Sequence, residues 1–474
     1  IPIVIVNNWS QFKEANTIAI SPRHEVKNQM QLRPQDPWPR SQGHVMLAMP
    51  GSEAKEKAYH EPGGSFSPGM GTFGVSVWLT NLKGELVTTS DTIPVNEISQ
   101  SLVWSDGQQL PQLKTNTQYY NTEWRNIEWG SWQLELNVPD NTTLYPSLLV
   151  RSVGPAGGAI REVSWDGESL VINKRWALAI RPAPKGIHLG EEGSPGWRGI
   201  NGGPTNIASQ LGWAFARIEL GDGKQWTANI QDEHPPSQPE FSSALRPIDL
   251  YVDLPDERFQ QSLNAQIAHL MMGLVGRETP SSDLTSYHPF AWQRHGAYVL
   301  VALARAGKLE AAKMLSKDFA KRDFFGGFGS EADAPGLAIW ALGTVANQLH
   351  QEDFDRWLWP NVYRKAELIE EMLSTRSDIH KAVDSLNLPK HINYSELTLV
   401  AEPAREGLIV GKMDHHRPIL FINAVSYRGL LEAAKLAGRL NHFIEAKRWA
   451  ASAEKIRGAW EKAFKPPFSN NDRT

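Results

Sequence analysis

The sequence predicts two structural parts, an N-terminal antiparallel β-sandwich and a C-terminal array of α-helices. Its 474 residues exceed what one ordinary hydrophobic core serves. The spacing of apolar residues also changes from a period of two to a helical period near residue 258. A stretch with four prolines, 231–247, lies before that change. We therefore expect a sandwich over 1–250 that ends in this linker, and a helical domain over 256–474.

Alternation of apolar and polar residues predicts the strands. The run Trp132-Gln-Leu-Glu-Leu-Asn-Val138 alternates strictly, and a similar run from Gly212 to Leu220 ends at a glycine-rich turn. Asp166-Gly167 is a hairpin signal between two further apolar runs. Many short strands separated by Gly and Pro turns, with little helical periodicity, are typical of a large antiparallel sandwich.

Seven helices are predicted after the linker from apolar stripes at helical spacing. Their approximate ranges are 259–274, 297–304, 311–319, 334–341, 362–373, 418–437 and 446–460. Asp333 is placed to cap the fourth helix, with Pro335 in its first turn. A loop of about forty residues is expected between the fifth and sixth helices, and loops of that length in compact domains usually have a function.

Composition excludes several functional classes. A net charge of −4 and a pI near 6.4 give no basic surface for nucleic acid or an anionic membrane. No apolar run approaches the ~18 residues of a membrane span. Without cysteine the chain has no disulfide, thiolate zinc site or cysteine nucleophile, and we expect no metal or other cofactor. The chain begins with Ile rather than Met, so we allow for upstream residues, and we slightly favour a periplasmic or secreted location.

Polar and aromatic residues are concentrated just before the second, fourth and sixth predicted helices. The candidates for binding or catalysis in these turns are Trp292, Arg294, His295, Glu331, Asp333, Asp414 and His416. The N-termini of alternate helices in a hairpin array point to the same end, so we expect these residues to converge. Structural roles remain open, because Asp333 could be a helix cap and Arg294 could pair with Glu331 or Asp333. Adjacent histidines without a third ligand do not predict a metal site.

A sandwich, a linker and tandem helical hairpins, with Trp292-x-Arg294-x-x-Ala-Tyr298 at the second helix, resemble the six-hairpin (α/α) toroid glycoside hydrolases. The glucoamylase-like and trehalase or α-glucosidase I-like families are the most similar in pattern. The resemblance implies an (α/α)6 toroid whose inner-helix loops line a sugar pocket, with a carbohydrate as substrate. Because only about seven helices are present, we expect a C-terminally truncated toroid, with the general base outside this chain.

The resemblance also implies roles for individual residues. Trp292 and Arg294 match the sugar-binding pattern Trp-x-Arg-Asp of these families, but His295 replaces its Asp. Glu331 and Asp333 stand where the families have a substrate-binding acid, and Asp414 stands at the position of the proton donor.

Three functions remain open at this stage. An inverting glycoside hydrolase that acts on a glucoside or related oligosaccharide is the leading prediction. An inverting sugar phosphorylase of the same architecture would use phosphate in place of water. A non-catalytic glycan-binding relative is the third possibility, and His295 in place of the family Asp favours it. His416, next to the predicted donor, could bind sugar hydroxyls in any of the three. Most of the 18 tryptophans are expected in the core, with a minority stacking on sugars.

Overall fold

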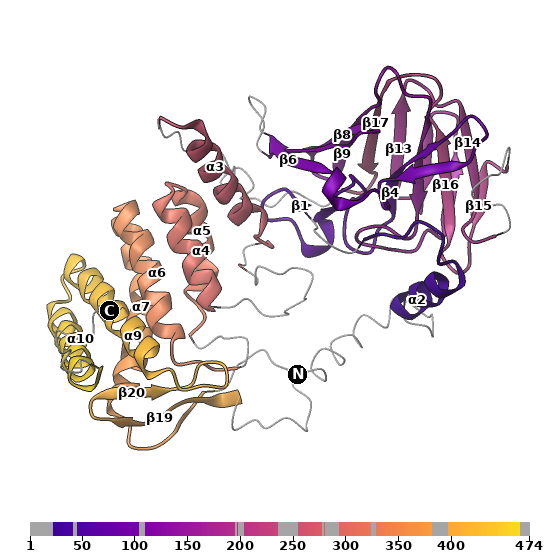
Figure 1. The fold of residues 1–474 in the computed structure, drawn as a ribbon. Coiled ribbons are helices and arrows are strands. Elements are labelled where there is room, and N and C mark those ends of the chain that lie inside the picture. Colours follow the sequence, from indigo (N-terminus) through magenta and orange to yellow (C-terminus); the bar gives the residue numbers. More distant parts are fainter. Residues whose placement is uncertain are drawn as a thin grey trace, which may run out of the picture. The chain divides into compact units, whose positions relative to one another are not determined.

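The computed structural model describes residues 22–40, 45–103, 110–194, 197, 203–235, 255–276, 279, 293–323, 329–381 and 397–464. They divide into two compact units. The β unit comprises the described residues between 22 and 235, and the helical unit comprises those between 255 and 464. Figure 1 shows the β unit in indigo to pink and the helical unit in red to yellow. Antiparallel sheets followed by helices confirm the predicted fold class.

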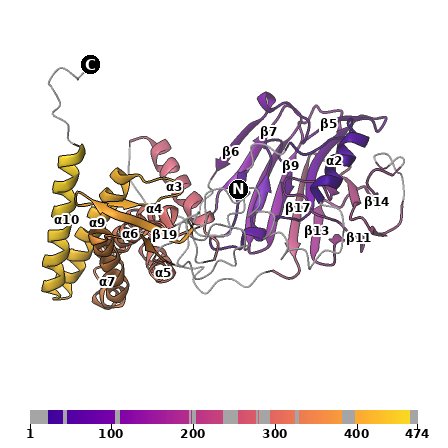
Figure 2. The ribbon, with the colours of Figure 1, turned by 90° about the horizontal axis from the view of Figure 1, so that it is seen from below.

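The β unit contains two antiparallel sheets. The first has eight strands, in the order β1 (Val45–Leu47), β2 (Ala58–His60), β3 (Phe66–Ser67), β4 (Gly74–Thr80), β10 (Tyr145–Arg151), β16 (Ala214–Glu219) and β14 (Gly186–Glu191), with β5 (Leu86–Thr89) paired to β4. The second has nine, in the order β15 (Asn206–Ala208), β11 (Glu162–Trp165), β12 (Ser169–Ile172), β13 (Trp176–Arg181), β17 (Gln225–Asp232), β9 (Ser131–Asn137), β8 (Asn121–Glu128), β7 (Gln112–Asn116) and β6 (Ser99–Val103). Figure 2 shows part of the strand order of this nine-stranded sheet. Helix α2 (Pro22–Leu32) and the short helices η2 (Ala54–Glu56) and η3 (Val95–Glu97) complete the unit.

Aromatic side chains fill the space between the sheets. In β9, Trp132, Leu134 and Leu136 are buried at alternate positions, as the sequence predicts. Phe66 of the first sheet stacks on Trp124 of the second, with ring centroids 3.9 Å apart. The Trp124 indole N–H donates a 2.9 Å hydrogen bond to the carbonyl of Gly64, so its one polar atom is satisfied inside the core.

The predicted linker begins in a strand. β17 continues through Asp232, so residues 231 and 232 belong to the second sheet. Residues 236–247 of the linker lie outside the part of the chain that the structure describes.

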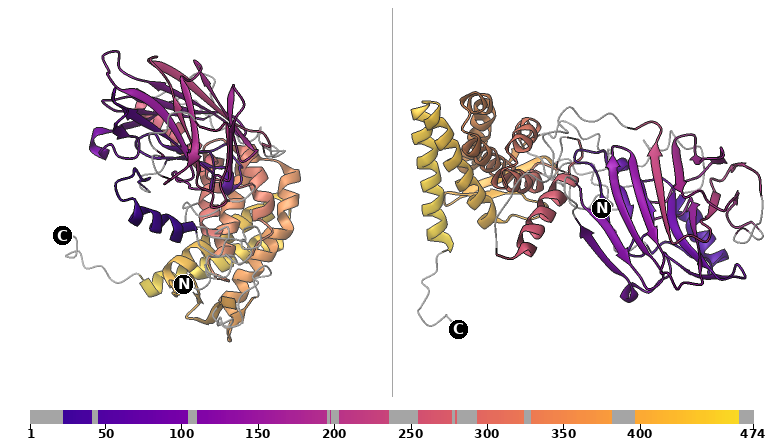
Figure 3. Two further views of the ribbon diagram at one scale, coloured as in Figure 1. Left: turned by 90° about the vertical axis from the view of Figure 1, so that its right-hand side faces the viewer. Right: turned by 90° about the horizontal axis from the view of Figure 1, so that it is seen from above.

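The helical unit contains all seven predicted helices. They are α3 (Glu257–Met272), α4 (Gln293–Arg305), α5 (Leu309–Phe319), α6 (Ala334–Leu349), α7 (Glu352–Ser374), α9 (Ile419–Arg439) and α10 (Phe443–Phe464). Six of them pack in two layers: α4, α6 and α9 lie side by side in one, and α5, α7 and α10 pack against them in the other, while α3 contacts α4. Figure 3 shows the hairpin of α9 and α10 in yellow. Among the helices that the structure describes, none has the length and apolar character needed to cross a membrane.

Helix α6 is the centre of this unit. Its residues are apolar on nearly all sides, which is expected for a helix surrounded by others. Glycines let it approach α9 closely: a Cβ on Gly336 would lie 2.7 Å from the backbone of Val425, and one on Gly429 would lie 2.8 Å from the Gly336 carbonyl oxygen. The first turn of α6 therefore rests directly on the α9 backbone.

Two expectations between the fifth and sixth helices were wrong. Helix α7 begins ten residues earlier than predicted, because buried Phe354 and Leu358 extend the apolar stripe across Pro360. The expected long loop includes a three-stranded sheet of β18 (Ile379–His380), β19 (Leu399–Arg405) and β20 (Leu408–Gly411). Glu406 and Gly407, both with positive φ, form the two-residue turn between β19 and β20. Glu-Gly is not among the common hairpin signals, so this turn could not be predicted from its two residues.

Candidate active site

Arg294, in the first turn of α4, is surrounded by three carboxyl groups. Its Nε donates to Asp333 Oδ2 at 3.0 Å, and its Nη2 donates to Glu331 Oε2 at 3.2 Å. Its Nη1 lies 3.6 Å from Asp414 Oδ2. We call these four residues the acidic cluster. They come from the first turn of α4 and the segments that precede α6 and α9, so these predicted site residues do lie together.

Asp333 occupies the N-cap position of α6 but does not cap the helix with its side chain. No hydrogen bond joins its carboxylate to the first backbone N–H groups of α6. The carboxylate instead accepts from Arg294, and its second oxygen, Oδ1, is buried without a hydrogen-bond partner among the described residues. The helix-cap interpretation of Asp333 is therefore wrong, whereas the pairing of Arg294 with Glu331 and Asp333 is observed.

The hairpin of β19 and β20 places Asp414. Gly411, at the end of β20, lies so close to the segment before α6 that an added Cβ would be 2.2 Å from the Cβ of Ala332. The Ala332 N–H donates to the Lys412 carbonyl at 2.9 Å. Two residues later the Asp414 N–H donates to Glu331 Oε1 at 2.8 Å. Asp414 has a φ of 53°, a left-handed conformation that Asp adopts more readily than most residues.

Burial differs sharply among the three carboxyl side chains. Those of Glu331 and Asp333 are 3% and 1% exposed, whereas that of Asp414 is 29% exposed. Asp414 is thus the carboxyl of the cluster that a dissolved molecule can reach most directly.

The electrostatics of the cluster favour a bound proton. Burial, together with the negative charge of Asp333, raises the pKa of Glu331 to about 8, although Arg294 and the Asp414 N–H oppose the shift. Burial also raises the pKa of Asp333, against the opposing effect of Arg294. Burial alone would lower the pKa of Arg294, but the three acids raise it, so the guanidinium stays charged. One cation does not balance three acids, so the pKa of Glu331 and that of Asp333 are both raised and this coupled pair favours a bound proton.

The other predicted site residues are placed differently. Trp292 lies outside the described residues. His295 is half-buried beside Arg294 on α4, and burial lowers its pKa, which favours a neutral ring at pH 7. No hydrogen bond joins His295 to the acidic cluster within the described part of the chain. His416 is exposed in the turn after Asp414, where its backbone N–H donates to the Met413 carbonyl at 2.9 Å. The structure therefore brings four of the seven predicted residues into direct contact.

Neighbouring charged groups are directed elsewhere. Arg417 is the arginine nearest in sequence to Asp414. Its Nε donates to Glu402 Oε1 at 2.9 Å, so its guanidinium is held by Glu402. Within the described residues, no group of three or more His, Asp or Glu side chains is arranged to hold a metal ion.

The sequence did not reveal which acid would hold a proton. Glu331 was predicted to bind substrate, yet it is the carboxyl whose pKa is raised to about 8. The available signal was the spacing Glu331-Ala-Asp333, which puts two acids near each other beside the small residues Ala332 and Ala334. Lys412, 1% exposed and adjacent to the cluster, was not singled out either, and its Nζ donates to the Leu397 carbonyl at 3.3 Å.

Comparison with known proteins identifies the fold. No protein-family model matches the sequence, and no curated protein matches it. Among solved structures, a bacterial glucoamylase complexed with acarbose aligns over 90% of this chain and 68% of its own, at 11% identity and a TM-score of 0.52. The chain has the fold of that glucoamylase. The predicted resemblance to six-hairpin glycosidases is thereby confirmed at the level of fold, while truncation stays a prediction.

Two further structures share less of the geometry. A family GH92 α-mannosidase from Bacteroides thetaiotaomicron aligns over 90% of this chain and 70% of its own, at 9% identity and a TM-score of 0.39. A second GH92-family glycosyl hydrolase aligns over 83% and 64% of the two chains, at 10% identity and a TM-score of 0.30.

Proposed function

We propose that the acidic cluster is the catalytic site of an inverting glycoside hydrolase that cleaves a glucoside or a related oligosaccharide. The observation that carries this proposal is the set of three carboxyl groups around one arginine, an arrangement that raises the pKa of Glu331 and of Asp333 beside the more exposed Asp414. Glycosidic cleavage needs a carboxylic acid that is still protonated near the working pH. The glucoamylase fold supports the same class of reaction, since that neighbour was solved with acarbose.

In this proposal Asp414 delivers the proton. Its side chain is the most exposed of the three carboxyls, and its backbone N–H is anchored to Glu331. The Asp414 O–H would protonate the glycosidic oxygen as the bond to the anomeric carbon breaks. A second carboxylate, outside the acidic cluster, would take a proton from the attacking water. Arg294, Glu331 and Asp333 would position sugar hydroxyls. Glu331 is the alternative donor, because its pKa of about 8 keeps it protonated.

Because the second carboxylate is expected outside this chain, the test is to incubate the full-length gene product with maltotriose and other α-linked gluco-oligosaccharides and to follow the anomeric protons of the products by NMR. Inversion releases the β-anomer first from an α-linkage. Parallel reactions with and without inorganic phosphate distinguish hydrolysis from phosphorolysis.

Three outcomes would contradict the proposal. Initial release of the α-anomer would exclude inversion. Formation of a sugar 1-phosphate only when phosphate is present would identify a phosphorylase. Glycan binding by the same preparation without any cleavage would favour a non-catalytic glycan-binding protein.

A further inference from the structure

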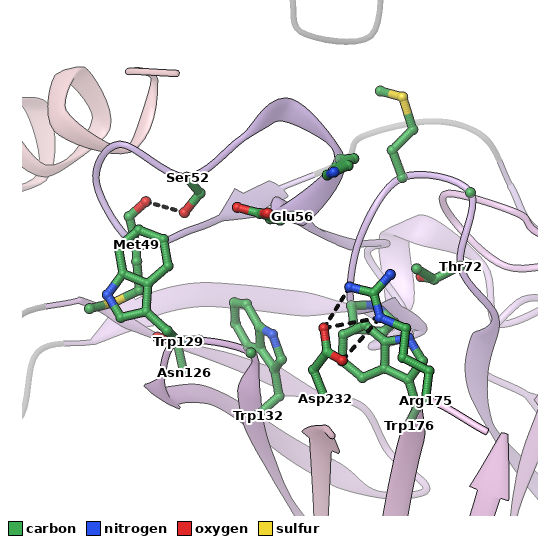
Figure 4. Close-up of a pocket in the computed structure, with 15 residues that line it drawn as sticks. Met49, Ser52, Glu56, Thr72, Asn126, Trp129, Trp132, Arg175, Trp176 and Asp232 are labelled. Atoms are coloured by element: carbon green, nitrogen blue, oxygen red, sulfur yellow. Dashed lines mark hydrogen bonds and ion pairs between the residues drawn. The ribbon is translucent and has the colours of Figure 1, made fainter. Parts of the chain in front are cut away.

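The β unit contains a pocket that the proposed function does not use (Figure 4). Its volume is about 150 Å³. It is lined by Met49, Ser52, Lys55, Glu56, Pro68, Met70, Gly71, Thr72, Asn126, Trp129, Gly130, Trp132, Arg175, Trp176 and Asp232. We call it the tryptophan pocket. All of its lining residues belong to the β unit, so it is distinct from the acidic cluster.

Three indole rings form the apolar part of the wall. Trp129 comes from the turn after β8, Trp132 from β9 and Trp176 from β13. The Arg175 guanidinium lies over Trp176 at 5.5 Å from the ring centroid, so that ring already has a partner. Trp129 and Trp132 lie on the opposite side of Asp232, as Figure 4 shows. Both are largely buried, and Trp132 also packs against Phe66 with ring centroids 5.3 Å apart, so each presents only part of its ring to the pocket. Such surfaces suit a ligand that has an apolar face and a polar rim.

Asn126 supplies an unsatisfied hydrogen-bond acceptor. Its Nδ2 donates to the carbonyls of Glu128 and Ser131, both at 3.1 Å, which fixes the orientation of the amide. Its Oδ1 is buried and has no hydrogen-bond partner among the described residues. A buried polar atom without a partner is uncommon and costs free energy, so a ligand hydroxyl that donates to Oδ1 would remove that cost.

The charges that line the pocket are matched. Arg175 donates through Nε and Nη2 to the carboxylate of Asp232 at 2.7–3.2 Å, and Asp232 Oδ1 also accepts from the N–H of His234. Lys55 and Glu56 add one group of each sign. A charged ligand would therefore leave a charge uncompensated, whereas a neutral one would not. The third guanidinium nitrogen, Nη1, is not used by the pair with Asp232 and can donate to a ligand oxygen.

The volume sets the size of the ligand. An apolar protein cavity of about 150 Å³ holds one benzene molecule, so this pocket accommodates a single six-membered ring. A neutral six-membered ring with apolar faces and several hydroxyls is a pyranose. We propose that the tryptophan pocket binds one pyranose unit of a neutral glycan, independently of any catalysis at the acidic cluster.

The test is calorimetric titration of the full chain with three probes: methyl α-glucopyranoside, methyl α-mannopyranoside and methyl β-galactopyranoside. We expect at least one of them to bind. Trp129→Ala should weaken that binding at least tenfold, because it removes one indole from the wall of the pocket. Trp165→Ala is the matched control, since Trp165 is a partly exposed tryptophan of the same unit that does not line the pocket, and it should change the affinity less than twofold.

A second control separates the two sites: Arg294→Gln alters the acidic cluster, so any binding event that it weakens belongs to that cluster, whereas the binding event that Trp129→Ala weakens should persist. If Trp129→Ala does not fold, as judged by circular dichroism, Trp129→Phe keeps a smaller ring and should weaken binding several-fold. Absence of binding by all three glycosides would overturn the proposal. Binding that survives Trp129→Ala but is lost in Arg294→Gln would also overturn the proposal, because it would place the glycoside at the acidic cluster. Preferential binding of tetramethylammonium would overturn it too, because it would identify the pocket as a cation cage.

Discussion

The two units each contain a group of arginines and carboxylates, and the two groups differ in charge balance. In the β unit, Arg33 and Arg151 both donate to Glu192, and Arg33 also donates to Asp36 at 2.9 Å. We call these four residues the balanced cluster, because two cations meet two anions. The side chains of Arg151 and Glu192 are fully buried. In the acidic cluster of the helical unit, one cation meets three acids.

This difference separates a structural role from a chemical one. In the balanced cluster each buried charge has a partner of opposite sign, and removing one partner would leave an uncompensated charge, so we assign this cluster a structural role. A surplus of buried acid raises pKa values, as it does for Glu331, and makes a proton available for transfer. Counting the charges around an arginine therefore discriminates between the two clusters better than the distances do, since both contain contacts near 3 Å.

The largest expected effect is on catalysis at the acidic cluster. Asp414→Asn removes the proposed donor, and general acid catalysis contributes about 10²–10⁴-fold, so kcat on oligosaccharides should fall by that range. Activated aryl glycosides should be affected much less, because their leaving groups depart without a proton. Steady-state kinetics on both substrate types makes the measurement. Near-normal turnover of oligosaccharides by Asp414→Asn would exclude Asp414 as donor and leave Glu331 as the candidate.

The next effect is on stability at the balanced cluster. Arg151→Met leaves the Glu192 carboxylate buried with only Arg33 as a partner, and breaking a buried ion pair costs about 3–5 kcal/mol. Urea unfolding should show this loss for the transition of the β unit. Cleavage chemistry at the acidic cluster should be unchanged wherever the variant is folded. A loss below about 1 kcal/mol would mean that the cluster does not stabilise the β unit.

An effect that is smaller for each pH unit is expected from pH on the stability of the helical unit. The pKa of Glu331 is 4.5 for an ordinary carboxyl and about 8 in the fold, so between these values the folded state holds a proton that the unfolded state has lost. Stability should therefore fall as pH rises from 4.5 to 8, by at most about 1.4 kcal/mol per pH unit for one proton. Unfolding of the chain and of Glu331→Gln at several pH values isolates this contribution. Parallel pH profiles for the two proteins would contradict the raised pKa.

The smallest effect is expected at the ion pair beside the acidic cluster. Glu402→Gln removes the partner of Arg417 without touching the cluster. Both side chains are about one-quarter to one-third exposed, and such pairs contribute about 0–1 kcal/mol. Stability should change within that range, and kcat should stay the same. A large fall in kcat would show that Arg417, once released from Glu402, perturbs the acidic cluster. Arg417 and Glu402 would then have to be counted as part of the site.

The sequence predicted the parts of the fold that local patterns determine. Alternation located β9, and apolar stripes located all seven helices of the helical unit. The convergence of Arg294, Glu331, Asp333 and Asp414 was predictable, because alternate helices of hairpins begin at the same end. The turn at Glu406-Gly407 was missed because its two residues give a weak local signal.

Properties that depend on tertiary packing could not be predicted from the sequence. The pKa of Glu331 depends on burial and on Asp333 and Asp414, which reach it only in the folded chain. The tryptophan pocket is assembled from segments as distant as Met49 and Asp232, so no sequence window contains its pattern.

The backbone at Asp414 limits which residues this position tolerates. With φ at 53°, most side chains would be strained there by roughly 1–2 kcal/mol, and Gly, Asn and Asp adopt this region most readily. In a library that randomises codon 414, selection for folding alone should enrich these three residues. Of the three, only Asp carries an acidic proton. Asn and Gly variants are thus expected to persist as folded proteins that lack the proposed proton donor, so a single base change would remove the proposed activity without unfolding the chain.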